Sequence, residues 1–326
     1  MTSTVSRHFT IGDCTERVAH VLCALISVTG WVAVHAADGA AAGPHLVGLV
    51  HDTRLAEISG MTRSMRRDDR YWVHNDSGNR GDMFAIDEQG SVRAKVHIAG
   101  VKKLVDPEDI AAFELDGRSY LLLADTGDNG GVRKNAEILI LEEPSTDATP
   151  AQSVTEVVPA WRVHFHYSDT PHDVEAVAVD VQAAEIVLLT KRTDPPELWT
   201  LPLRPGDDRE QIAERRASLR LPTSTQSAEG LPKLSPTGLV IAPDGSCAYV
   251  LTYREVWRYA RLPGQSWPEA FQHVPTVLPF AFVPQAEAIA ITRDGQALRI
   301  TGEHWPAPIV QIDLEPALSS NATTVE

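Results

Sequence analysis

A pair of short apolar runs recurs five times along this chain of 326 residues, and this repeat constrains the fold more than any other feature. The first runs read SGMTRS, EDIAAF, EAVAVD, TGLVIAP and EAIAIT, and the second runs read YWVHN, YLLLAD, EIVLLTK, CAYVLTY and ALRITGE. From the start of each first run to the polar residue that closes the second is 16 or 17 residues, whereas successive pairs start 49 to 67 residues apart. A constant hairpin with insertions outside it is typical of β-propeller blades.

Each pair is followed by a third apolar run, namely MFAID, EILILEE, ELWTLPL, EVWRYAR or IVQIDLE. Short apolar runs between Gly, Pro, Asp and Asn indicate strands, and the best helical stretch is REQIAERRASL at 209–219. We therefore predict an all-β fold, a single β-propeller over 44–316 with five blades. A sixth blade stays open, in the 145–160 stretch or in PKLSPTG at 232–238. HLVGLV at 45–50 has no other partner and is predicted to close the ring on the last blade.

The N-terminal segment has the features of an export signal. No Asp, Glu, Lys or Arg occurs from Val18 to Ala37, Arg7 and Arg17 precede this run, and Val34, His35 and Ala36 form a cleavage-like site. We predict a signal peptide over 1–37 and a periplasmic or extracellular protein. An uncleaved membrane anchor is the alternative, because the run is about as long as a bilayer span. Residues 317–326 are predicted to be a flexible tail.

Composition narrows the range of partners. The formal net charge is −15 and no run is rich in Lys or Arg, which argues against nucleic acid, and against a membrane beyond the leader, as the main partner. Cys14 and Cys23 lie in the leader, so Cys247 is left alone and no intrachain disulfide forms in the mature chain. We expect a monomer with a small-molecule or anionic ligand.

The hairpin geometry predicts one charged face. In an antiparallel pair, the start of the first strand and the end of the second lie at the same edge, and the innermost strands of a propeller line its channel. Two sets of residues should therefore surround one mouth of the channel. The first set is Ser59, Glu108, Glu175, Thr237 and Glu287, and the second is Asp76, Asp125, Lys191, Arg254 and Glu303.

The chain also resembles a known group of proteins. The resemblance lies in the order of five motifs along the chain. They are WVHNDSGNRGDMFAIDEQG, DPEDIAAF with YLLLADTGDN, DVEAVAVD with LLTKR, SPTGLVIAPDG with LTYR, and QAEAIAITRDG. This order resembles that of a group of secreted bacterial β-propellers, which is similar to the esterase-like and phytase-like propellers. The resemblance covers about residues 58–303 and implies the propeller fold. It implies metal-dependent hydrolysis only loosely, since propellers host many functions.

Acidic residues at the predicted mouth suggest a divalent cation, Ca²⁺. Hard cations prefer several carboxylate and carbonyl oxygens, with glycines that let the backbone approach. The predicted metal ligands are Asp76, Glu108, Asp125, Asp128, Glu175 and Glu287. The alternative is that Asp and Asn residues such as those of TGDN only build tight turns.

Basic residues at the same mouth suggest an anion pocket. The predicted ligand-binding residues are Asn75, Asn129, Lys191, Arg192 and Arg254. Salt bridges to glutamates such as Glu175 are the alternative role for the cations. His74 and Glu303 are the predicted groups for proton transfer, because both lie beside the channel. A zinc site at His164 and His166, on one face of an outer strand, with His172 nearby, is a lesser alternative.

Two functions are compatible with these residues. The first is a metal-dependent hydrolase of phosphate esters, esters or lactones. The second is a non-catalytic propeller that binds a ligand or protein and carries a structural metal. The sequence contains no G-x-S-x-G, H-E-x-x-H, Walker or C-x-x-C-H motif, so the chemistries that those motifs mark are not indicated.

Overall fold

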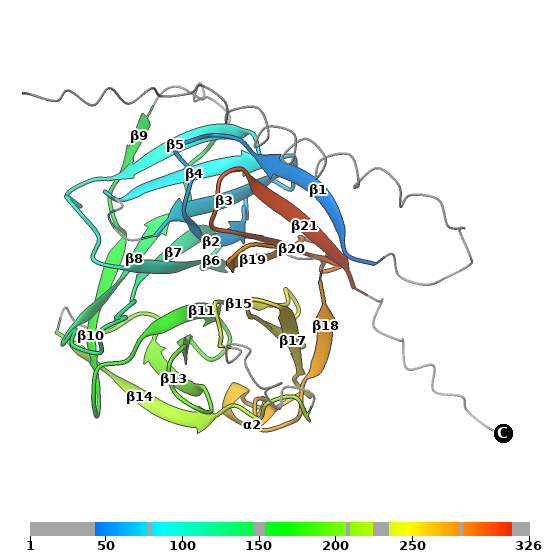
Figure 1. The fold of residues 1–326 in the computed structure, drawn as a ribbon. Coiled ribbons are helices and arrows are strands. Elements are labelled where there is room, and N and C mark those ends of the chain that lie inside the picture. The colour runs from blue at the N-terminus through cyan, green and yellow to red at the C-terminus, as the bar shows by residue number, and fades with distance from the viewer. Residues whose placement is uncertain are drawn as a thin grey trace, which may run out of the picture. The chain divides into compact units, whose positions relative to one another are not determined.

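Antiparallel sheets account for almost all regular structure in the computed structural model, as the all-β prediction requires (Figure 1). It describes residues 43–76, 78, 80–146, 154–206, 209–223, 235–280 and 283–314. The predicted leader (1–37) and tail (317–326) lie outside the described residues. Everything below concerns the compact unit formed by residues 41–326. Among the described residues no helix is long and apolar enough to cross a membrane.

The first two hairpin repeats each begin a sheet. The strands that contain the first repeat are β2 (Ile58–Arg63), β3 (Arg70–Asn75), β4 (Asp82–Asp87), β5 (Val92–Ile98) and β9 (Val154–Val157). Those of the second are β6 (Pro107–Leu115), β7 (Arg118–Asp125), β8 (Ala136–Glu142) and β10 (Trp161–Tyr167). In both sheets the first two strands pair antiparallel, β2 with β3 and β6 with β7. In contrast, β9 pairs in parallel with the outer edge of β5.

The other three repeats follow the same plan. The third comprises β11 (Val174–Asp180), β12 (Glu185–Thr190), β13 (Glu197–Pro202) and β14 (Gln211–Ser218). The fourth comprises β15 (Gly238–Ile241), β16 (Cys247–Leu251), β17 (Glu255–Ala260) and β18 (Thr276–Pro279). The last comprises β19 (Ala286–Ile291), β20 (Ala297–Gly302), β21 (Ala307–Asp313) and β1 (His45–Val50). Parallel pairing of β10 with β14 joins the second and third sheets into one of eight strands.

The inner strands form a ring. In cyclic order, β2 contacts β6, β6 contacts β11, β11 contacts β15, β15 contacts β19, and β19 contacts β2. Figure 1 shows these inner strands toward the centre and the third and fourth strands toward the outside. Sheets arranged this way around a central axis are the architecture of a β-propeller.

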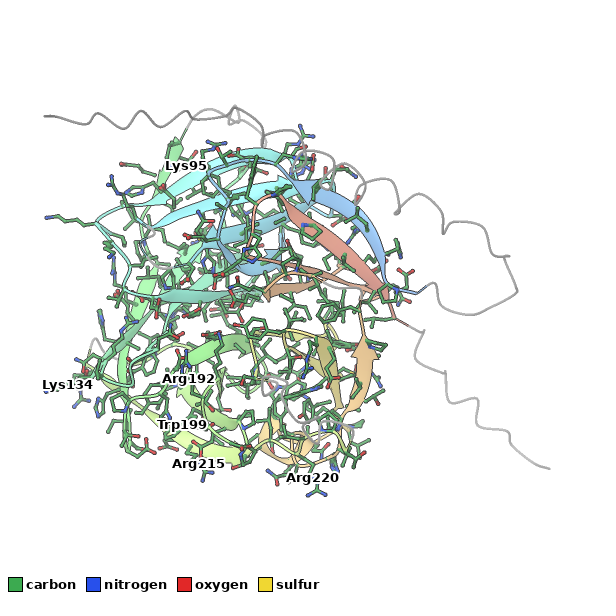
Figure 2. All side chains as sticks on the ribbon, viewed as in Figure 1. Lys95, Lys134, Arg192, Trp199, Arg215 and Arg220 are labelled. Atoms are coloured by element: carbon green, nitrogen blue, oxygen red, sulfur yellow. The ribbon has the colours of Figure 1, made fainter. Side chains whose placement is uncertain are left out.

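The core lies between neighbouring sheets. Because each sheet packs on both faces, strands such as β7 are apolar along most of their length. Between the second and third sheets, for example, Leu122, Ile138 and Leu188 pack with Trp199, which Figure 2 labels on β13. The segment between β17 and β18 contains the short helix α2 (Trp267–Ala270), whose Trp267 packs in the neighbouring cluster.

Two local predictions concern the helical candidate and the stretches named for a sixth blade. The best helical candidate, 209–219, is not a helix, because Gln211–Ser218 forms the strand β14 between β13 and β10. Pairing on both edges outweighs the helical preference of its Glu, Arg and Ala residues. Within the 145–160 stretch, the described residues contribute β9 to the edge of the first sheet. Residues 232–234 of PKLSPTG lie outside the described residues.

The N-terminal strand pairs as expected. β1 pairs antiparallel with β21, from His45 opposite Gln311 to Val50 opposite Ala307. The sheet of the last repeat therefore contains strands from both ends of the described chain. Val50 and Ala307 are buried together between this sheet and the first one.

Candidate functional site

Local irregularities in the inner strands create the site. The pairing register shifts once near the start of four hairpins, between Ile58 and Gly60, Pro107 and Asp109, Val174 and Ala176, and Ala286 and Ala288. The extra residues are Ser59, Glu108, Glu175 and Glu287. A β-bulge turns one side chain away from the regular alternation. Three of these four residues, Glu108, Glu175 and Glu287, line a cavity at one end of the ring.

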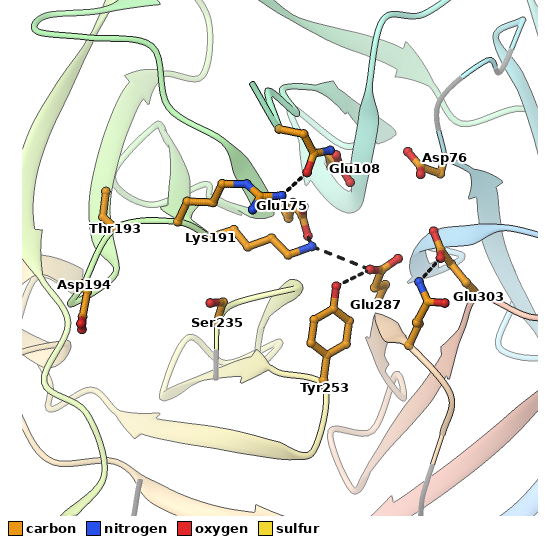
Figure 3. A pocket seen from close by; sticks show the side chains of 13 residues that line it. Asp76, Glu108, Glu175, Lys191, Thr193, Asp194, Ser235, Tyr253, Glu287 and Glu303 are labelled. Carbon is orange, nitrogen blue, oxygen red and sulfur yellow. Dashed lines mark hydrogen bonds and ion pairs between the residues drawn. The ribbon is translucent and has the colours of Figure 1, made fainter. Parts of the chain in front are cut away.

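A cavity of about 590 Å³ lies at this end, and Figure 3 shows its lining. The predicted residues that line it are Asp76, Glu108, Asn129, Glu175, Lys191, Arg192, Glu287 and Glu303. Tyr253, Thr193, Asp194, Ser235 and Gln285 complete the lining. Among the basic residues labelled in Figure 2, Arg192 lies toward the centre, whereas Arg215 and Arg220 lie toward the edge. Asp76 and Glu303, which are 227 positions apart in sequence, thus meet on one surface.

Carboxylates in and beside this cavity form two groups that share one member, Glu108. Oxygens of Asp76, Asp106 and Glu108 lie within 4.8 Å of one another, and so do oxygens of Glu108, Asp173 and Glu175. Sequence reasoning missed Asp106 and Asp173. The signal was present, because an Asp stands two residues before the bulged Glu in both the second and the third repeat. In each D-x-E motif, oxygens of the two side chains lie within 4.8 Å of one another.

Three acidic side chains at this end, those of Asp173, Glu175 and Glu287, lie close to a cation. Asp173 accepts hydrogen bonds from Arg192 Nε at 2.6 Å and from the Asp128 backbone N–H at 2.8 Å. Glu175 forms an ion pair with Lys191, whose Nζ also lies 3.8 Å from Glu287 Oε1. Figure 3 shows Lys191 directed between these glutamates, with Tyr253 beside it.

The Tyr253 hydroxyl completes that network. It donates to Glu287 Oε1 at 2.8 Å, and Lys191 Nζ lies 5.2 Å from the centre of its ring. Tyr253 was not predicted, because the alternation pointed to the next residue, Arg254. Arg254 does not line the cavity, and its backbone N–H contacts Thr252.

Glu108 differs from the other buried carboxylates. Its Oε2 accepts a hydrogen bond from Ser59 Oγ at 3.2 Å, and Glu108 forms no ion pair with any described residue. Its side chain is 5 % exposed and belongs to both carboxylate groups. A buried carboxylate that lacks a cation is costly, and a bound cation is one way to neutralise it.

Burial shifts the acidity of this end of the ring. Desolvation, followed by the charge of Glu175, raises the pKa of Glu108 well above its usual value. Desolvation also raises the pKa of Glu175 to about 7, although Lys191 opposes this shift. The pKa of Glu303 rises to about 8, through desolvation and then the neighbouring Glu287. Glu175 and Glu303 therefore exchange protons near neutral pH.

The TGDN segment acts on the site indirectly. Asp125 accepts from the backbone N–H groups of Val105 and Asp106 at 3.0 and 2.8 Å, and from Arg133 Nη1 at 2.8 Å. Asp128 accepts from the N–H groups of Val132 and Arg133 at 3.0 and 2.7 Å. Neither lines the cavity. These contacts agree with turn formation, the alternative to metal ligation for both residues.

Gly127 explains why this segment has so little bulk. A Cβ at this position would lie 2.1 Å from Glu108 Oε1 and 2.6 Å from Asp106 Oδ2. The backbone thus packs directly against Glu108, which lines the cavity, and against Asp106, a member of the same carboxylate group. Any larger residue would push them apart.

His74 and Asn75 lie behind the cavity rather than in it. The His74 side chain is fully buried, its Nδ1 lies 3.0 Å from the Asn75 carbonyl oxygen, and its Nε2 has no partner among the described residues. Burial lowers the pKa of His74 to about 4. Asn75 donates to the Arg54 carbonyl oxygen at 2.6 Å. His74 therefore has no access to a ligand in the cavity, and we assign it no role in proton transfer.

His164 and His166 lie on β10, the outer strand of the second sheet. His164 lies 3.5 Å from Glu137 and His166 lies 3.5 Å from Glu210. Within the described part of the chain, no histidine joins a group that could hold a metal. The zinc alternative therefore gains no support from this arrangement.

Comparisons with known proteins add little. No family model and no curated protein matches the chain. Among solved structures, hydrazine synthase from Kuenenia stuttgartiensis is 11% identical with a TM-score of 0.42, and the match covers 79% of this chain and 71% of that one. A nidogen/laminin complex is 13% identical with a TM-score of 0.37, covering 76% and 73%. The periplasmic gluconolactonase of Pseudomonas aeruginosa is 14% identical with a TM-score of 0.38, covering 74% and 68%.

Likenesses this distant do not bear on activity. The resemblance to the esterase-like and phytase-like propellers remains a prediction from the motifs. The residues of the cavity are therefore the basis for assigning a function.

Proposed function

We propose that this chain is a hydrolase that uses a divalent cation, Ca²⁺, to cleave a small phosphate ester, ester or lactone. The observation that carries the proposal is the cavity of about 590 Å³ beside the carboxylates of Asp76, Glu108 and Glu175. A structural ion is enclosed by protein ligands, whereas a catalytic ion keeps a position for substrate or water. These carboxylates face an open space of substrate size.

The ligand set suits a hard cation. All the converging atoms are carboxylate oxygens, and each group of three lies within 4.8 Å. Two oxygens on opposite sides of one Ca²⁺ ion are about 4.8 Å apart, because each Ca–O distance is about 2.4 Å. Asp76, Asp106, Glu108, Asp173 and Glu175 are the proposed ligands. A bound cation would polarise a substrate oxygen and lower the pKa of water.

The remaining residues of the cavity have complementary roles in the proposal. Lys191, between Glu175 and Glu287, attracts a negatively charged substrate oxygen, and Arg192 adds positive charge at the rim. Glu303 holds or releases a proton near neutral pH, since its pKa is raised to about 8. Tyr253 keeps Glu287 in place through its hydroxyl.

Several finer points belong to the same proposal. The propeller has five blades, which is supported by the cyclic contacts of β2, β6, β11, β15 and β19. β1 closes the ring as the outer strand of the last blade, supported by its pairing with β21. Export through the leader and action as a monomer in the periplasm or outside the cell are part of it as well.

The test combines cation binding with hydrolysis. The full-length chain is treated with EDTA, titrated with Ca²⁺ by calorimetry, and assayed on p-nitrophenyl phosphate, p-nitrophenyl acetate and a δ-lactone. We expect Ca²⁺ binding and hydrolysis of at least one substrate. Glu108→Gln should weaken Ca²⁺ binding by about tenfold or more, because it removes a charged ligand of both carboxylate groups. Glu303→Gln should keep Ca²⁺ binding and lose most of the rate.

Glu142→Gln is the matched control, because Glu142 is an exposed glutamate on β8 that pairs only with surface arginines. It should leave both readouts unchanged. Absence of Ca²⁺ binding would refute the metal site. Ca²⁺ binding without hydrolysis of any substrate would instead favour the non-catalytic binding propeller.

A further inference from the structure

The opposite end of the ring contains a second cavity. Its volume is about 440 Å³, and it is lined where the inner strands β2, β6, β11 and β15 end and where β19 turns outward. Its charged lining includes Arg63, the last residue of β2, and Arg293, just after β19. Its apolar lining includes Val179 and Ile241. This cavity shares no lining residue with the carboxylate cavity.

Arg63 is an unpaired cation in this cavity. Its side chain makes no hydrogen bond or ion pair with any residue of the part that the structure describes. Arg63 is partly buried, and desolvation, followed by the charge of Arg293, lowers the pKa of its guanidinium. A desolvated guanidinium with five unused donors is unfavourable unless a ligand supplies acceptors.

The neighbouring charges are almost all engaged elsewhere. Arg293 donates to Asp68 at 2.6 Å and to the Met65 carbonyl oxygen at 3.1 Å. Arg261 donates to Asp180 at 2.6 Å.

The two nearby glutamates leave Arg63 without a partner as well. Glu143 accepts from Trp72 Nε1 at 2.9 Å and from the Met65 backbone N–H at 3.0 Å, and it also contacts Ser64. Glu114 also lines the cavity, but it is exposed and forms no ion pair with a described residue. Among the described arginines that line this cavity, Arg63 is therefore the cation whose bonding capacity remains available.

We infer that this cavity binds a small organic carboxylate, held by Arg63 in bidentate fashion and by the field of Arg293. The planar guanidinium matches the two oxygens of a carboxylate, and the fork gives direction as well as charge. The apolar part of the ligand lies against Val179 and Ile241. The site is independent of the proposed hydrolase activity, since it lies at the other end of the ring.

Benzoate is the probe, with benzamide as its neutral isostere and inorganic phosphate as an oxyanion without an apolar group. Binding to the EDTA-treated full-length chain is measured by calorimetry, so the carboxylate cavity holds no metal. We expect benzoate to bind and benzamide not to bind. Arg63→Gln should weaken benzoate binding by about tenfold or more, because a charged hydrogen-bonded pair is lost. Arg63→Lys should restore only part of it, since lysine lacks the fork.

Arg118→Gln serves as the matched control, because Arg118 is an exposed arginine at the start of β7 and does not line the cavity. It should bind benzoate like the unchanged protein. Melting temperatures show whether Arg63→Gln remains folded, and its Ca²⁺ titration should be unchanged. Equal binding of benzoate and benzamide, no benzoate binding, or binding that survives Arg63→Gln would each overturn the inference. Binding of phosphate but not of benzoate would overturn the carboxylate assignment.

Discussion

The two ends of the ring are built from the same inner strands but carry opposite chemistry. At one end, bulges direct Glu108, Glu175 and Glu287 into a cavity. At the other end, the pairing register is regular, and the strand ends place Arg63 and Arg293 around a second cavity. Charge at each end is therefore set by local register rather than by the average composition of the strands.

The buried carboxylate of Asp109 connects inner strands of the ring. Asp109 is 1 % exposed and accepts backbone hydrogen bonds from Ile110, Val177 and Leu239 at 2.8, 2.7 and 3.2 Å. These donors belong to β6, β11 and β15. Desolvation raises the pKa of Asp109 well above its usual value, although the hydrogen bonds from the three N–H groups act to lower it. Asp109 thus links three inner strands where their N–H groups face the axis.

Removing Asp109 should have the largest effect. Asp109→Ala leaves three buried N–H groups without acceptors, so we expect the free energy of unfolding to fall by about 3 to 5 kcal/mol. Urea denaturation measures this loss. Glu142→Ala, which removes only exposed ion pairs, should cost less than about 1 kcal/mol. If the two variants were equally stable, Asp109 would not link the inner strands, and the two ends would be joined by apolar packing alone.

Gly127→Ala should separate the two ends functionally. Its Cβ would meet Glu108 Oε1 at 2.1 Å and Asp106 Oδ2 at 2.6 Å, so both carboxylates must move. We expect Ca²⁺ affinity to fall by about tenfold or more, while benzoate binding at the Arg63 end stays the same. Calorimetric titration of each ligand measures both effects.

Gly130→Ala is the matched control for this substitution. The nearest atom to its Cβ would be Val132 Cγ2 at 3.5 Å, an ordinary contact. Its Ca²⁺ affinity should match that of the unchanged protein. A Gly127→Ala protein that binds Ca²⁺ normally would show that Glu108 and Asp106 are not the ligands.

A smaller effect is expected from pH. Glu175 and Glu303 have folded-state pKa values of about 7 and about 8, above the ordinary glutamate value of 4.5. The folded chain therefore binds more protons than the unfolded chain in this window. Without metal, the stability from these groups is present below about pH 4.5 and is lost as pH rises toward 8. Bound Ca²⁺ favours the ionised carboxylates and should oppose that loss.

Melting temperatures in EDTA and in Ca²⁺ measure this difference from about pH 5 to about pH 8. We expect the gap between the two series to widen by a few degrees as pH rises, on the order of the shift that 1 kcal/mol produces. Glu303→Gln should reduce the slope in EDTA. A gap that is the same at both pH values would show that protons and Ca²⁺ do not compete at this end.

Much of the fold could be predicted because strand signals are local. Apolar runs at constant spacing identified the hairpins, and hairpin geometry then brought Glu108, Glu175 and Glu303 to one cavity. Sequence reasoning misjudged local structure where hydrogen bonds to neighbouring strands outweigh the helical preference of the residues. Residues 209–219 read as helical but form β14, since strands on both sides supply its hydrogen bonds.

The finer assignment of site residues depended on backbone detail. Asp125 and Asp128 follow a strand at the predicted mouth, yet their oxygens are used by backbone N–H groups and Arg133. Asp106 and Asp173 precede the strands and were overlooked, although they join the carboxylate groups. Turn conformation decided both outcomes, and residue type alone does not reveal it.

By itself, the sequence determined the all-β class, the repeated hairpin and the acidic character of one end, because alternation and spacing act within a few residues of each other. Only the tertiary structure decided which carboxylates meet, where Lys191 and Tyr253 compensate them, and that Arg63 is left unpaired at the other end. Bulges and packing between sheets set those positions, and both depend on contacts between residues far apart in the chain.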